Sequence, residues 1–125
     1  MTESKGIQSD LIPKIATGLC GGISRTNGTC GAVLGSVMVL NVIYGRNNVL
    51  DVEKKDTNYL KVQQFLQNFE REFGSTNCQV LTGCDLSTEQ GLEKFETDNM
   101  DEQCKKYVEK ATNVVMSLLE IPTNE

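Results

Sequence analysis

The chain has 125 residues, which is enough for one compact domain with a core of its own, and we expect a single domain over residues 1–125. Its net charge of −5, without a basic patch, argues against nucleic acid as a partner. The sequence contains no histidine, which excludes His-based general base catalysis, Ser-His and Cys-His pairs, and His-ligated haem or zinc.

The N-terminus and the cysteines indicate the compartment. Met1–Lys5 lacks the apolar core of a signal peptide, and no apolar segment is long enough to span a bilayer. We therefore expect a cytoplasmic protein that is not embedded in a membrane. Five cysteines are many for such a chain. In a reducing compartment they are more typical of catalytic, redox or metal-binding sites than of structural disulfides.

The chain begins with a polar stretch, Met1–Gln8, that we expect to be frayed. Ser9-Asp10 then offers an N-cap to a short helix, because apolar residues recur after it at helical spacing. This helix should end at Gly18 or Gly21.

A glycine-rich turn, Leu19–Gly31, leads into the start of the next helix. Such a loop can hold an anion on its backbone N–H groups, and the candidate ligands are Gly28, Gly31 and Arg25. Its spacing matches neither a P-loop nor a dinucleotide-binding fingerprint. A plain tight connection between helices is therefore the favoured interpretation.

The longest apolar run, Gly28–Gly45, predicts one buried helix with apolar residues on nearly every side. Gly45 is a natural stop, because glycine adopts the left-handed backbone at a helix end. A core strand over Val37–Tyr44 is the alternative, since Val and Ile favour strands, but the run is long for a strand. Small residues on one flank would let another backbone approach, within the chain rather than in a dimer: Ala32, Gly35 and Ser36.

Cys30 lies at the expected N-cap of this helix. Free N–H groups and the helix dipole stabilise negative charge there, so a thiolate would have a lowered pKa and be a better nucleophile or metal ligand. The alternative is a small buried apolar residue, which free cysteine often is. The position by itself does not decide between the two.

A polar, turn-like segment, Arg46–Lys55, precedes a strongly amphipathic helix over Asp56–Phe73 that is stopped by Gly74. We assign its apolar stripe to core packing: Tyr59, Val62, Phe65, Leu66, Phe69 and Phe73.

A short helix follows, with Asn77 as N-cap and Gly83 as stop. Cys78 lies in its first turn and is the second thiol at a predicted helix start, a repetition that favours a functional role. Cys84 lies just beyond the stop, and its spacing from Cys78 matches no CxxC redox or zinc pair.

Ser87 and Gln90 have the spacing of a capping box for a further short helix, which ends near Asp98-Asn99. The last helix runs from there to about Glu120, with a buried stripe of Cys104, Val108, Ala111, Val115 and Leu118. The predicted architecture is an all-α, single-domain helical bundle around a buried central helix. Cys30, Cys78 and Cys104 could then converge on one end of that helix.

The run Cys30–Gly35 matches a CGAxxG motif, and the chain resembles the C_GCAxxG_C_C family over about residues 11–120. Gly21-Gly22-Ile23 ahead of the motif, and blocks around Phe73–Cys78 and Cys104–Val108 after it, support the resemblance. By motif, Cys30, Cys78 and Cys104 resemble the last three of the four family cysteines. Either Cys20 substitutes for the first one or the chain lacks it, and Cys84 is an extra.

The resemblance implies a redox-active protein, and we expect Cys30 as the attacking thiolate with Cys78 or Cys104 as resolving partner. In a variant, Cys30, Cys78 and Cys104, with Cys20 or Cys84, hold an iron–sulfur cluster or another thiolate-bound metal. The alternatives are a small metal- or anion-binding accessory protein associated with a transporter, and a structural helical adaptor. The redox partner, and whether the chain forms a homodimer, remain open.

Overall fold

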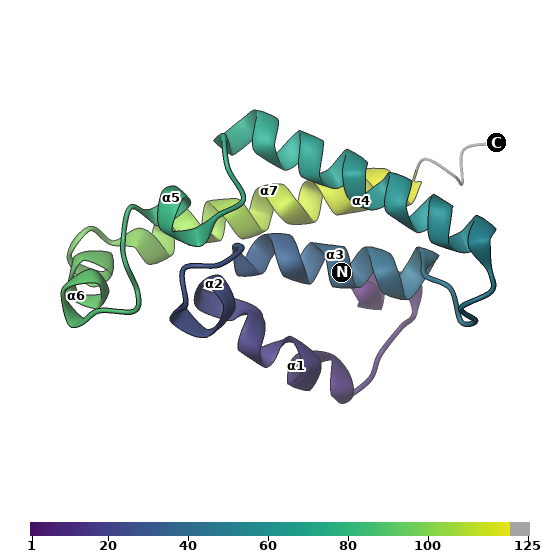
Figure 1. The fold of residues 1–125 in the computed structure, drawn as a ribbon, viewed down its shortest axis with the longest axis horizontal. Coiled ribbons are helices and arrows are strands. Elements are labelled where there is room, and N and C mark those ends of the chain that lie inside the picture. The colour runs from purple at the N-terminus through teal and green to yellow at the C-terminus, as the bar shows by residue number, and fades with distance from the viewer. Residues whose placement is uncertain (121–125) are drawn as a thin grey trace.

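The computed structural model describes residues 1–120, except for the side chains of residues 3, 4 and 120. These residues confirm the predicted all-α class (Figure 1). The α-helices are α1 (Leu11–Ala16), α2 (Cys20–Arg25), α3 (Gly31–Tyr44), α4 (Val52–Phe73), α5 (Cys78–Thr82), α6 (Glu89–Thr97) and α7 (Met100–Glu120), and the 3-10 helices are η1 (Thr2–Lys5) and η2 (Thr17–Leu19). Within the described part of the chain, no helix is both long and apolar enough to cross a membrane.

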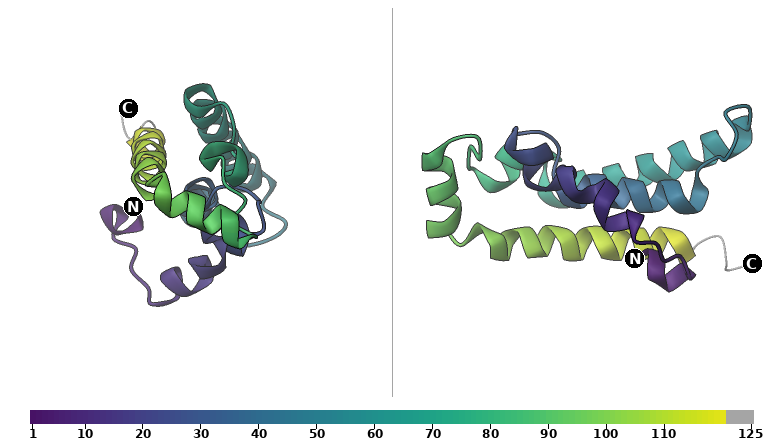
Figure 2. Two further views of the ribbon diagram at one scale, coloured as in Figure 1. Left: turned by 90° about the vertical axis from the view of Figure 1, so that its left-hand side faces the viewer. Right: turned by 90° about the horizontal axis from the view of Figure 1, so that it is seen from below.

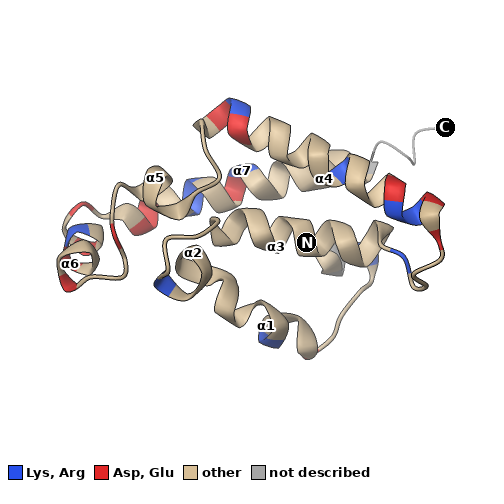
Figure 3. Ribbon diagram, in the orientation of Figure 1, with Lys and Arg blue, Asp and Glu red and all other residues tan. Residues whose placement is uncertain are grey.

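Helix α3 occupies the middle of the molecule and packs against α4 and α7 on one side and the α2 segment on the other. Figures 1 and 2 show α1 and α2 along the outer side of α3, with α6 across one end of the bundle. Figure 3 shows that α3 carries no charged residue, whereas charges mark α4, α6 and α7. The core consists of Val33, Leu40, Phe65, Phe69, Tyr107, Ala111, Val114, Val115, Leu118 and Leu119. Because Gly31–Tyr44 form the helix α3, the alternative of a core strand over Val37–Tyr44 is wrong.

The two ends of α3 differ in how well they were predicted. Cys30 is its N-cap, as expected. Gly45 does end the helix, but in an extended conformation with φ of −68° rather than the expected left-handed one. Its N–H donates to the carbonyl of Asn41 at 2.7 Å, and a Cβ at position 45 would clash with that same oxygen. Glycine is thus required at position 45 because a side chain would prevent this close approach of the backbone to the carbonyl of Asn41.

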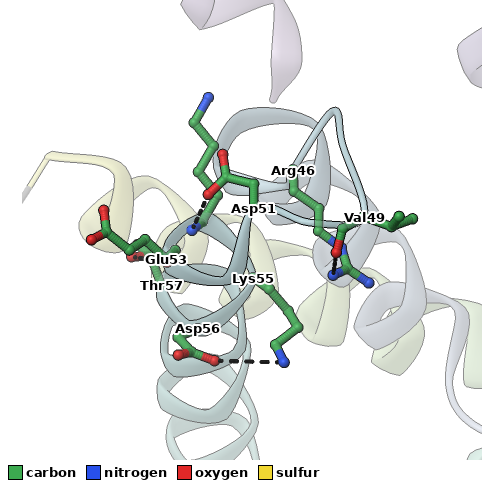
Figure 4. Close-up of polar contacts among 8 residues, drawn as sticks. Arg46, Val49, Asp51, Glu53, Lys55, Asp56 and Thr57 are labelled. Carbon is green, nitrogen blue, oxygen red and sulfur yellow. Dashed lines mark hydrogen bonds and ion pairs between the residues drawn. The ribbon is translucent and has the colours of Figure 1, made fainter.

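Helix α4 begins at Val52, so the prediction of a turn through Lys55 is wrong for its last residues. The carboxylate of Asp51 accepts a hydrogen bond from the N–H of Lys54 at 3.1 Å and caps the helix early (Figure 4). Tyr59, expected in the core stripe, is 55% exposed. Lys61 is buried instead, and its ammonium donates to the carbonyl of Leu118 at 3.2 Å.

The later helices match the prediction closely. Asn77 caps α5 by accepting the N–H of Val80, and Gly83 ends it with φ of 69°. The capping residue of α6 is Thr88, not Ser87, whose hydroxyl donates to Asp85 instead.

Two segments differ from their expected exposure. On α7, Ala111, Val115 and Leu118 are buried, but Val108 is 52% exposed. Residues 1–8, for which the sequence predicts a frayed end, contain η1, and Met1 packs against the core.

Candidate functional site

Two short extended segments join the starts of α3 and α5. Thr29 and Asn77 form an isolated antiparallel β-bridge. On either side of it, the N–H of Cys30 donates to the carbonyl of Thr76 at 2.7 Å, and the N–H of Cys78 donates to the carbonyl of Gly28 at 2.9 Å. Cys78 pairs with Gly28, and Cys30 lies two residues after Gly28 on the same extended segment. Because alternate residues of an extended segment face the same side, Cys30 and Cys78 lie on the same side of the bridge. The bridge therefore fixes two cysteines, from distant parts of the sequence, at neighbouring helix starts.

A cavity of about 450 Å³ lies at this end of the bundle and is lined by Cys20, Cys30, Cys78 and Cys104. Its other walls are mainly apolar or small: Met1, Gly21, Gly22, Gly31, Ala32, Gly35, Ser36, Leu81, Thr82, Leu86, Phe95, Tyr107, Val108 and Ala111. The three cysteines of the predicted site thus face one space, and Cys20 joins them. What these cysteines do chemically stays a prediction.

The small flank of α3 serves this cavity and not the close approach of another backbone. Ala32, Gly35 and Ser36 all line it. A Cβ built on Gly35 would meet none of the atoms described beyond its own helix within 4 Å. The expectation that this flank packs against a second backbone is therefore wrong, because small side chains here leave room.

The α2 segment is wound in the left-handed sense. Gly21, Gly22, Ile23 and Ser24 have φ between 57° and 68°. Such a conformation costs an ordinary L-residue about 1–2 kcal/mol, so it needs support from its surroundings.

Two close approaches hold this segment against the cavity. A Cβ at Gly22 would lie 2.6 Å from the Cβ of Cys78. A Cβ at Gly31 would lie 3.1 Å from the Cα of Cys20 and 3.2 Å from the carbonyl oxygen of Leu19. Glycine at both positions therefore lets the backbone of α2 lie close to Cys78 and to the start of α3.

The three residues proposed for an anion have different surroundings. The N–H of Gly28 donates to the carbonyl of Gly22 at 2.8 Å. Gly31 lines the cysteine cavity, whereas Arg25 lines a neighbouring cleft of about 850 Å³. An anion site made of Gly28, Gly31 and Arg25 stays a prediction.

Cys84 lies apart from the other thiols' cavity. It is 1% exposed, packs with Cys78 and Leu86, and its thiol donates to the carbonyl of Thr82 at 3.4 Å. This position agrees with its interpretation as an extra cysteine.

Burial is the main cause of a raised pKa at two of the thiols. Desolvation raises the pKa of Cys78, and negative charge on Cys30 and Cys84 raises it further. Desolvation, with the charges of Cys30, Cys78, Asp101 and Cys84, raises the pKa of Cys104 to about 11. For Cys78 this is the opposite of what a helix start alone predicts, because α5 is short and the thiol is buried.

Sequence reasoning assigned no role in the site to Tyr107, which lines the cavity. Its hydroxyl donates to the carbonyl of Leu81 at 2.7 Å, which fixes α5 against α7. Its spacing from Cys104 on one helix face is the signal that could have identified it.

One of three comparisons with known proteins finds a match. The model of a family described as "Putative redox-active protein (C_GCAxxG_C_C)" matches residues 1–118. No curated protein matches, and no solved structure does.

Proposed function

Because the chain belongs to the C_GCAxxG_C_C family of putative redox-active proteins, we propose that it transfers electrons by thiol–disulfide exchange, with Cys30 and Cys78 as the redox pair. The observation that carries this proposal is the bridge that fixes both cysteines on one cavity. Exchange requires two sulfur atoms that can reach each other without large backbone movement. Apolar walls suit the neutral disulfide product better than a pair of thiolates.

Cys30 is the attacking thiol in this scheme. The raised pKa values of Cys78 and Cys104 keep both thiols protonated at neutral pH, which makes them poor nucleophiles. The Cys30 thiolate attacks one sulfur of a disulfide presented in the cavity and forms a mixed disulfide. The other sulfur leaves as a thiolate and takes up a proton from water.

Cys78 then resolves the mixed disulfide. A Cys30 sulfur in a disulfide carries no charge, so one cause of the raised pKa of Cys78 disappears when Cys78 must ionise. The Cys78 thiolate attacks the Cys30 sulfur, forms the Cys30–Cys78 bond and releases the second thiolate. Two protein thiols are oxidised, and one external disulfide is reduced to two thiols.

A thiolate-bound metal or iron–sulfur cluster is the second candidate. Four cysteines facing one cavity favour it, since sulfur ligands select soft metals. Among residues 1–120, however, no three or more Cys, Asp or Glu groups are placed to hold a metal ion together. Cys20, Cys30, Cys78 and Cys104 would have to move closer together to bind one.

The test is anaerobic purification followed by equilibration across a series of reduced and oxidised dithiothreitol mixtures. Alkylation of free thiols and peptide mass mapping then locate any disulfide. We expect a Cys30–Cys78 bond in the wild type and in Cys84→Ser, the matched control. Native mass spectrometry of the same sample tests for bound metal.

Two results would contradict the proposal. One is an absence of any disulfide that includes Cys30 across the whole series. The other is excess mass, lost on denaturation and reduced stepwise by removal of each cysteine, which would favour the metal centre. If Cys30→Ser and Cys78→Ser change stability alone, the structural adaptor is the better description.

A further inference from the structure

Cys20 differs from the other cysteines in its access to solvent. Of the five, all of which lie in the described part of the chain, it alone is exposed, while the others are half-buried or buried. An oxidant arriving from solvent can therefore reach Cys20 before the inner sulfurs. Cys78 and Cys104, which line the cysteine cavity, are buried and half-buried respectively.

Cys20 also stands between two hollow spaces. It lines the cysteine cavity and the neighbouring cleft of about 850 Å³, which we call the outer cleft. Gly21, Leu86 and Phe95 line both spaces as well, so the two adjoin at this point. The charged side chains lie on the outer side: Arg25, Glu96 and Asp101.

The backbone holds Cys20 beside the start of α3. Its Cα would lie 3.1 Å from a Cβ at Gly31, the residue that follows Cys30. The left-handed segment after Cys20 is in turn held where Gly22 meets Cys78. Two contacts in the first half of α2, at Cys20 and at Gly22, thus fix Cys20 at the junction of the outer cleft and the cysteine cavity.

We propose that Cys20 is the outer thiol of a relay, which accepts a small-molecule disulfide in the outer cleft and passes the oxidation to Cys30. This inference rests on the proposed function and assigns its substrate class and first step. Arg25, Glu96 and Asp101 give the outer cleft charged groups that can contact the polar ends of such a molecule. The cysteine cavity, which has no charged lining residue, receives only the sulfur–sulfur bond.

The relay has three balanced exchanges. The Cys20 thiolate attacks the external disulfide, joins one of its sulfurs and releases the other as a thiolate. Cys30 then attacks the Cys20 sulfur, forms a Cys20–Cys30 bond and releases the second small thiolate. Finally Cys78 attacks the Cys30 sulfur and frees Cys20, and every released thiolate can take up a proton from water.

The experiment mixes the reduced, metal-free protein with the aromatic disulfide 5,5′-dithiobis(2-nitrobenzoate) and follows its coloured thiolate by stopped flow. The wild type and Cys84→Ser should show a fast bimolecular release and then a second, concentration-independent one. Cys20→Ser should slow the first release about tenfold or more, because the remaining cysteines are half-buried or buried and a reagent from solvent reaches them less easily. Cys30→Ser should stop after the first release, with the aryl group trapped on Cys20 in the peptide map.

Equal first-phase rates in wild type and Cys20→Ser would overturn the role of Cys20. So would a map of Cys30→Ser in which the aryl group sits on another cysteine. The proposed function is judged separately, by whether dithiothreitol mixtures form the Cys30–Cys78 bond in Cys20→Ser.

Discussion

Gly22 supports the most specific prediction about how the site is built. Replacement by alanine adds a Cβ at φ of +68°, 2.6 Å from the Cβ of Cys78 and 3.2 Å from the backbone nitrogen of Gly28. The left-handed backbone should cost about 1–2 kcal/mol. Overpacking against Cys78 should add about 1–3 kcal/mol. The free energy of unfolding should therefore fall by about 2–5 kcal/mol in total.

Urea denaturation followed by far-UV circular dichroism measures this change, and Gly74→Ala is the matched control. Gly74 also has a positive φ, +82°, but a Cβ there would have nothing described within 4 Å. Gly74→Ala should therefore cost only the backbone term, about 1–2 kcal/mol. The difference between the two variants measures the steric contacts of the new Cβ with Cys78 and with the backbone of Gly28.

Equal losses of unfolding free energy in Gly22→Ala and Gly74→Ala would refute this reasoning, because they would mean that α2 does not lie in close contact with Cys78. A double-mutant cycle gives a sharper version. In a Cys78→Gly background the Gly22→Ala cost should become smaller, because the contacts with the Cys78 side chain are gone and only the one with the backbone nitrogen of Gly28 remains. If Gly22→Ala lowers the free energy of unfolding by the same amount in the Cys78→Gly background, the strain does not come from contact with Cys78.

Three further predictions concern acidity, the cavity and a helix cap. The pKa of Cys104 is about 11 in the folded protein against an ordinary 9.0, so the folded state binds more protons in that window and stability should fall as pH rises from 9 to 11. Cys104→Ser should flatten this fall in thermal melts, and a fall of unchanged size would contradict the assignment. Gly35→Ala should raise stability by about 0.5–1 kcal/mol, since the new methyl enters open space on a helix; a loss in urea denaturation would mean that the space is filled. Asp51→Ala should cost about 1 kcal/mol by the same assay through loss of the α4 cap. The control Asp56→Ala, whose pairing with Lys55 spans 4.0 Å at the surface, should cost little, and equal losses would argue against the cap.

Local chemistry was enough to predict most of the helices. Asn77 and Gly83 bound α5 as expected, and Cys30 caps α3, because capping depends on residues only a few positions apart. Errors arose where two local signals compete. Asp51 rather than a later residue caps α4, and Thr88 rather than its neighbour Ser87 caps α6.

The acidity of the thiols could not be predicted from the helix starts. A helix start lowers the pKa of an exposed thiol, but Cys78 is 7% exposed and lies near other cysteines. Desolvation depends on what the rest of the chain puts around a residue. That information is distributed over several helices and has no local signature.

The sequence by itself determined an all-α chain, the positions of its main helix ends, and a set of cysteines without histidine partners. Periodicity and capping are short-range, so they can be deduced from neighbouring residues. Only the tertiary structure decided that Cys20, Cys30, Cys78 and Cys104 share one cavity and that Cys84 does not. That choice depends on the bridge between Thr29 and Asn77 and on the close approaches at Gly22 and Gly31, which are contacts between segments that are separate in the sequence.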